Sequence, residues 1–172
     1  MGKTEQTFDS FNVRAENRLA YHVAVAAVER PGLYNPIVIY GPSWTGKSHL
    51  MNAVENAVRG QSTKKSIVHI SAHHFINVYI AALGEGLHAE TKQAYQTADY
   101  LLLENLEDMC GKESCQQFIA SIICNAVAED HQVMLTSAVG LQSLGALNAS
   151  LRNCECGVLA EVRPFSTDRG GQ

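Results

Sequence analysis

The feature that most constrains this chain is an eight-residue segment, residues 41–48, that fits the pattern G-x-x-x-x-G-K-[ST]. Residues 36–40 before it form an apolar run rich in β-branched side chains, which is typical of a buried strand. Residues 47–58 after it have helical periodicity. A strand, a glycine-containing loop and a helix in this order direct backbone N–H groups and a helix N-terminus at one anion. The segment therefore predicts an α/β fold that binds the phosphates of a nucleotide.

The residue types in this segment fit that chemistry. We expect the Lys47 ammonium to contact the β- and γ-phosphates and the Ser48 hydroxyl to ligate Mg²⁺. ATP or ADP with Mg²⁺ is therefore the predicted cofactor, and Trp44 is expected to face outward at the loop tip. A chance match in a turn is the alternative, and the flanking strand and helix argue against it. The predicted nucleotide-binding residues are Gly41, Pro42, Ser43, Trp44, Thr45, Gly46, Lys47, Ser48 and His49.

Strand-like and helix-like segments alternate along the rest of the chain. Further strands are predicted at residues 66–70, 100–103, 132–136 and 157–162, and further helices at residues 17–29, 74–83 and 113–129. Alternation of this kind predicts βαβ units and a five-stranded, mostly parallel sheet with helices on both faces. We expect one domain over residues 7–164, with flexible ends at residues 1–6 and 165–172.

Composition narrows the class of protein. The 172 residues carry 13 Lys and Arg against 17 Asp and Glu, a formal net charge of −4, and 46% are hydrophobic. This balance argues against a tight, non-specific nucleic-acid binder, although a local basic patch is compatible with it. The sequence has no apolar run long enough for a membrane span and no apolar signal core at its N-terminus. The five cysteines, without an export signal, favour reduced thiols and a cytoplasmic location.

Several short strings beyond the loop resemble one family, the AAA+ ATPase domain of the bacterial replication initiator DnaA. The resemblance spans about residues 7–164 and implies a P-loop NTPase fold with an AAA+ core. It also implies a role in replication initiation or its regulation, and head-to-tail contacts with other subunits of this type. By resemblance, Phe11, Val13 and Asn17 lie near the adenine. The matching strings are Thr7-Phe8-Asp9-Ser10-Phe11, Asn17-Arg18-Leu19-Ala20, Tyr34-Asn35-Pro36, Ala98-Asp99-Tyr100-Leu101-Leu102-Leu103, Gly111-Lys112-Glu113 and Leu135-Thr136-Ser137.

The chain departs from this family at the positions that drive hydrolysis. The resemblance implies two acidic residues after the strand at 100–103, the first orienting Mg²⁺ and the second activating water. Here they are Glu104 and Asn105, and a neutral amide cannot act as a general base. Glu107 or Asp108 could substitute if the following turn bends back. By the same resemblance, Thr136 is expected in the sensor region of the next strand.

Further departures concern charge. After the Thr136-Ser137 pair, the family's sensor aspartate is replaced by Ala138. The two arginines that act in the family on a neighbour's γ-phosphate align with Ser150 and Cys154, and only Arg152 lies nearby. An arginine finger contributes about 10³–10⁵ in turnover. The segment before the third strand, arginine-rich in the family, has one positive charge at residues 92–96, which predicts weak or indirect DNA binding.

Three functions follow from these observations. The first is a nucleotide-binding domain linked to replication initiation, with weak or no hydrolysis. The departures above favour it, and the chain is also expected to be too short for the family's helical lid and helix-turn-helix domain. The second is an active DNA-dependent ATPase of the initiator or helicase-loader type. The third is a non-enzymatic module that docks on a full-length initiator. A metal site at His69, His73 and His74 is disfavoured because no further ligand stands at a suitable spacing, and a redox role for Cys154 and Cys156 has little support.

Overall fold

A computed structural model describes residues 5–152 and 157–164, apart from the side chain of Ser150. Its five strands are β1 (Ile37–Tyr40), β2 (Ile67–Ser71), β3 (Tyr100–Glu104), β4 (Gln132–Ser137) and β5 (Val158–Glu161). Its α-helices are α1 (Arg18–Glu29), α2 (Lys47–Arg59), α3 (Ala72–Glu85), α4 (His88–Gln96), α5 (Glu113–Ala128) and α6 (Ala149–Arg152). Two 3₁₀ turns, η2 (Leu106–Met109) and η3 (Leu141–Ser143), follow β3 and β4.

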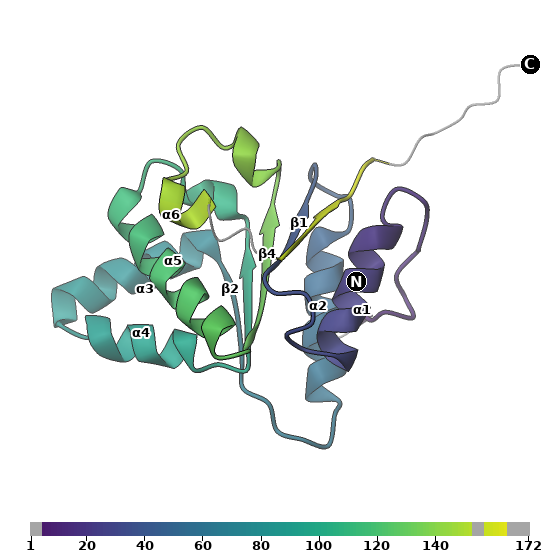
Figure 1. The fold of residues 1–172 in the computed structure, drawn as a ribbon, viewed down its shortest axis with the longest axis horizontal. Coiled ribbons are helices and arrows are strands. Elements are labelled where there is room, and N and C mark those ends of the chain that lie inside the picture. The colour runs from purple at the N-terminus through teal and green to yellow at the C-terminus, as the bar shows by residue number, and fades with distance from the viewer. Residues whose placement is uncertain (1–4, 153–156, 165–172) are drawn as a thin grey trace, which may run out of the picture.

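The strands form one sheet in the order β2-β3-β4-β1-β5, and all four pairings are parallel. The predicted α/β class and five-stranded sheet are confirmed. Helices α1 and α2 cover one face of this sheet, and α3, α4 and α5 cover the other (Figure 1). Because parallel strands end at the same edge, the loop after β1 lies beside the ends of its neighbour β4 and of β3 next to it.

Two apolar layers hold the helices on the sheet. Side chains alternate between the faces of a strand, so Leu102 packs in the layer under α1 and α2, whereas Leu101 and Leu103 pack in the layer under α5. All three are fully buried. Burial on both faces explains why the central strands are continuous apolar runs in the sequence.

Helices α3, α4 and α6 differ most from the sequence prediction, and the short α6 was not predicted. Helix α3 begins at Ala72, two residues early, because the Ser71 side chain caps it by accepting a hydrogen bond from the backbone N–H of His74 (3.2 Å). Helix α4 was not predicted, since it buries none of its residues and therefore lacks an apolar stripe. Among the described helices, none is long and apolar enough to cross a bilayer.

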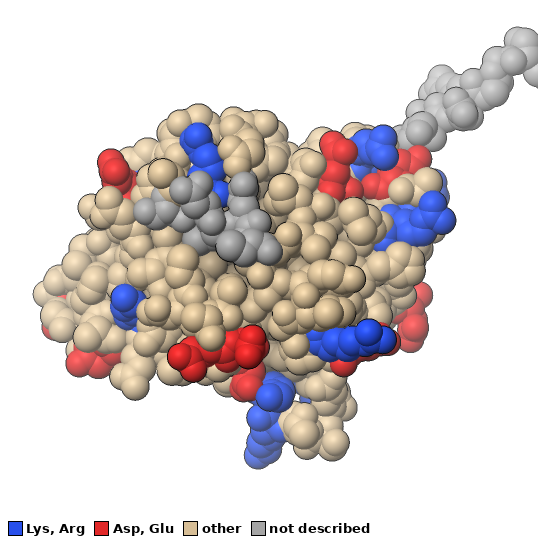
Figure 2. All heavy atoms as spheres, viewed as in Figure 1, with Lys and Arg blue, Asp and Glu red and all other residues tan. Residues whose placement is uncertain are grey.

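The charged side chains are sparse and mixed on the face drawn in Figure 2. Blue and red groups stand near one another there, and most of the surface between them is uncharged. This agrees with the small net charge of the chain. No continuous basic stripe follows the described helices on this face.

Candidate nucleotide-binding site

The loop between β1 and α2 has the backbone conformation that its glycines allow. Gly41 and Gly46 have φ angles of 153° and 100°, and Trp44 between them has a φ of 65°. The Thr45 hydroxyl donates to the carbonyl oxygen of Pro42 (2.8 Å) and closes the turn. The side chain of Trp44 is fully exposed, as predicted for the loop tip. Helix α2 begins immediately after the loop, so the unpaired N–H groups of its first turn lie beside it.

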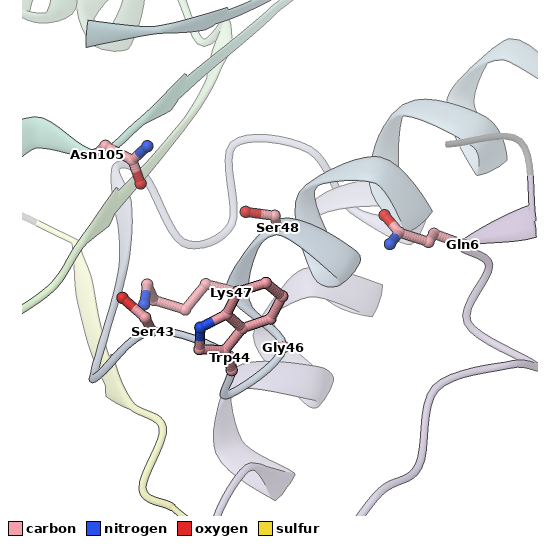
Figure 3. Close-up of a pocket in the computed structure, with 7 residues that line it drawn as sticks. All are labelled: Gln6, Ser43, Trp44, Gly46, Lys47, Ser48 and Asn105. Carbon is pink, nitrogen blue, oxygen red and sulfur yellow. The ribbon is translucent and has the colours of Figure 1, made fainter. Parts of the chain in front are cut away.

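This loop forms one side of a cavity of about 340 Å³, drawn in Figure 3. Asn105, at the end of β3, lies across the cavity from the loop, and Gln6 lies at its other end. The lining residues are Gln6, Ser43, Trp44, Gly46, Lys47, Ser48 and Asn105. A cavity of this size lies within the range of small-ligand sites.

Lys47 is held inside the loop. Its ammonium donates to the carbonyl oxygens of Gly41 (2.5 Å) and Pro42 (2.8 Å), and only 9% of the residue is exposed. Burial lowers the pKa of Lys47 below its ordinary value, and the negative charges of Glu107 and Glu104 partly oppose this effect. The structure therefore places one cation at the base of the loop.

Ser48 and Glu104 come from different elements and contact each other. Ser48 lies in the first turn of α2 and Glu104 is the last residue of β3, and the serine hydroxyl donates to Oε2 of that carboxylate. A hydroxyl and a carboxylate are the hard oxygen ligands that Mg²⁺ prefers. The residues predicted to hold Mg²⁺ are thus brought together, and their chemistry fits that ion.

The carboxylate of Glu104 also contacts His69, a histidine to which the sequence analysis assigned no role. His69 on β2 approaches Oε1 of Glu104 with Nε2 (2.8 Å) and Oε2 of Glu55 on α2 with Nδ1 (2.5 Å). Burial alone would lower the pKa of His69, but its hydrogen bonds to Glu104 and Glu55 and their charges outweigh burial and raise it. Burial would likewise raise the pKa of Glu55, yet hydrogen bonds and charges from His69 and Arg59 lower it.

Asn105 takes the left-handed conformation, with a φ of 60°. Its backbone N–H donates to the hydroxyl of Thr136 (3.1 Å), which is fully buried on β4. Thr136 therefore supports the backbone that presents Asn105, and its hydroxyl is engaged in this contact. The turn after Asn105 bends back: Glu107 accepts a hydrogen bond from the backbone N–H of Ala138 (3.0 Å) at the end of β4.

The three residues expected near the adenine lie in different environments. The ring of Phe11 packs on the loop, because a Cβ atom at Gly46 would lie 2.8 Å from it, and the ring also contacts His49 (5.1 Å between centroids). Asn17 is buried, and its amide bonds to the backbone of Arg14 and Asn12 within its own turn. Val13, by contrast, is exposed. Adenine contacts by these residues stay a prediction.

Arg152 is turned inward. Its guanidinium donates to the carbonyl oxygens of Leu144 (3.0 Å) and Leu147 (2.8 Å), both in the segment that precedes α6. These contacts tie the group to its own chain. The other two positions considered for an arginine finger, Cys154 and the side chain of Ser150, lie outside the described residues.

A parallel sheet with this loop at the carboxyl end of β1 and an acidic residue at the end of β3 defines an α/β protein of the P-loop NTPase class with an AAA+ core. The profile of the family described as the bacterial DnaA ATPase domain matches residues 3–161. The chain belongs to this family.

Similar proteins agree with this assignment. A chromosomal replication initiator protein DnaA from Thermus thermophilus is 35% identical over 161 residues, which are 92% of this chain and 37% of that protein. A structure of the replication initiator DnaA bound to AMPPCP and single-stranded DNA superposes with a TM-score of 0.89 at 32% identity, covering 94% of this chain and 50% of that one. Domain III of Thermotoga maritima DnaA gives 0.89 at 27% identity, covering 93% and 68%. The chain thus spans little more than a third of the length of the Thermus relative.

Proposed function

We propose that this chain is a cytoplasmic, nucleotide-binding AAA+ domain that acts in replication initiation or its regulation and hydrolyses ATP weakly or not at all. Mg-ATP or Mg-ADP would bind in the cavity at the loop. The observation that carries the proposal is that Lys47, Ser48 and Asn105 line this cavity, while the Ser48 hydroxyl donates to the carboxylate of Glu104, the residue before Asn105. The DnaA relative that binds AMPPCP supports the choice of ligand.

Different residues of the proposed site would contact the phosphates, the Mg²⁺ ion and water. Lys47 and the first N–H groups of α2 would neutralise the phosphates, and Ser48 with Glu104 would hold Mg²⁺ directly or through water. When bound, Mg²⁺ would supply charge neutralisation of the β- and γ-phosphates. Asn105 lines the cavity with an amide, which can orient water but cannot accept its proton. The site is therefore equipped for binding more fully than for hydrolysis.

A titration tests binding. Trp44 is fully exposed and lines the cavity, so its fluorescence should change when Mg-ATP or Mg-ADP binds. Calorimetry on the same samples should give a 1:1 complex, and Lys47→Ala should weaken it at least about tenfold, because a charged hydrogen bond to phosphate is lost. No fluorescence change together with no heat of binding would refute the proposal.

A turnover assay tests the proposal that ATP hydrolysis is weak or absent. We expect phosphate release slower than about one per second. Asn105→Asp should raise it, by up to about 10²–10⁴ if proton transfer limits the reaction. Wild-type turnover at or above about one per second would refute impaired hydrolysis.

DNA contact is proposed to be weak or indirect. Residues 92–96 lie in α4 and carry one positive charge, and the face in Figure 2 has no basic stripe among its described residues. Since phosphate contacts supply most non-specific affinity, single-stranded DNA should be released at ordinary salt. Salt-dependent retention near about 0.15 M ionic strength would contradict this.

A second candidate is favoured by Arg152. A subunit whose arginine is tied to its own carbonyl oxygens could accept a DnaA-type neighbour on its nucleotide face without activating the next nucleotide. Such a module would shorten head-to-tail assemblies of a full-length initiator. Adding the chain to an ATP-bound initiator should then reduce assembly size in light scattering, and an unchanged size would exclude this role.

A further inference from the structure

Outside the loop itself, one cluster of charged groups links three elements through a single ring. His69 lies between Glu104 on β3 and Glu55 on α2, 2.8 Å and 2.5 Å from their oxygens. The side chains of His69, Glu104 and Glu55 are only 5%, 14% and 19% exposed. Arg59, one turn further along α2, holds the outer carboxylate through contacts of 2.8–2.9 Å.

The geometry fixes the orientation of Glu104. An ionised carboxylate only accepts hydrogen bonds, so the ring donates from Nε2 to Glu104 and from Nδ1 to Glu55. One oxygen of Glu104 is thereby held by His69, and the other accepts the hydroxyl of Ser48. Ser48 and Glu55 both lie on α2, so this helix is linked to Glu104 on β3 in two ways. Ser48 contacts the carboxylate directly, and Glu55 is connected to it through the ring of His69.

We propose that His69 is a positioning residue for the magnesium site: it fixes Glu104 so that Oε2 faces Ser48, and so sets the affinity for Mg²⁺. The inference rests on the proposed nucleotide function. Without the ring, Glu104 would lose the partner that holds its Oε1 and could turn toward other donors, away from Ser48. Residues that orient a metal-binding carboxylate typically change metal affinity by about 10–100-fold.

The test measures the Mg²⁺ concentration that half-saturates the tightening of ADP binding, by calorimetry at fixed ADP. His69→Phe keeps an aromatic ring and removes both donors, and it should raise this concentration about 10–100-fold. Affinity for ADP in EDTA should change less than about twofold, since Lys47 and the loop are untouched. His73→Phe, at an exposed histidine on α3, is the matched control and should behave as wild type.

A double-variant cycle separates positioning from a general structural effect. In the background of Glu104→Gln, His69→Phe should have little further effect on the Mg²⁺ concentration, because the proposed role acts through that carboxylate. His69→Gln, which retains one donor, should fall between wild type and His69→Phe, and it serves if the Phe variant does not fold.

The outcomes are distinct. Equal Mg²⁺ dependence in wild type and in folded His69 variants would overturn this inference alone. An equal loss from His69→Phe with and without Glu104 would also overturn it, by showing that the effect bypasses the carboxylate. Absence of ADP binding by the wild type, with and without Mg²⁺, would refute the proposed function and this inference with it.

Discussion

Gly41 shows how a single residue can be fixed both by its own backbone and by a distant strand. Its φ of 153° is unfavourable for residues with a side chain, and a Cβ atom there would lie 2.0 Å from the carbonyl oxygen of Val162. The first glycine of the loop is therefore required by packing against the segment after β5, in addition to any approach of phosphate.

Gly41→Ala should lower the free energy of unfolding by about 2 kcal/mol or more, because strain and a backbone clash add. Urea unfolding followed by circular dichroism would measure it. The matched control is Gly84→Ala in α3, where a Cβ atom would meet nothing within 4 Å. That variant should be neutral or more stable, since it favours the helix. Equal stability of both variants would show that the clash is relieved without cost.

At the scale of elements, one carboxylate joins the starts of two strands. Asp99, just before β3, accepts hydrogen bonds from the ammonium of Lys65 (2.9 Å) and from the backbone N–H and hydroxyl of Ser66 (2.8 and 2.7 Å), just before β2. The hydrogen bond from Lys65, with those from Ser66, lowers the pKa of Asp99 to about 2. The ionised carboxylate of Asp99 therefore anchors the start of β3 to the residues just before β2.

This anchor predicts a pH dependence of stability. A carboxyl whose pKa is lower in the folded state stabilises it fully above the unfolded value of 3.8, and this contribution is lost as the pH falls toward about 2. The difference in urea midpoint between wild type and Asp99→Asn should therefore shrink from about pH 6 to about pH 3. A difference that stays constant over this range would show that the charge of Asp99 does not contribute.

At the scale of the whole molecule, burial is uneven between the helices that cover one face of the sheet. Helix α5 has eight buried residues, whereas α4 beside it has none. Regions with few buried apolar contacts open locally at low free energy. Amides of residues 88–96 should thus exchange with deuterium at least about tenfold faster than those in the middle of α5. Mass spectrometry of peptides would measure this, and equal protection would show that α4 opens only with the core.

The site could be predicted from sequence as far as its residues are neighbours in the chain. The motif at 41–48, the strand before it and the helix that begins at Lys47 form one continuous segment, so spacing alone predicted Lys47 and Ser48 as site residues. Glu104 was predicted as a site residue through the family resemblance, and the structure brings its carboxylate to the Ser48 hydroxyl. His69 was not assigned to the site, because a histidine within an apolar strand gives no signal of two carboxylates 14 and 35 residues away.

The sequence by itself determined the α/β class, the five strands and the position of the loop between β1 and α2, because periodicity and short motifs are local properties of the chain. Only the tertiary structure decided the strand order, the inward turn of Arg152 and the bridge from Glu55 through His69 to Glu104. These depend on which residues meet across the sheet, and that is set by the packing of distant elements rather than by spacing along the chain.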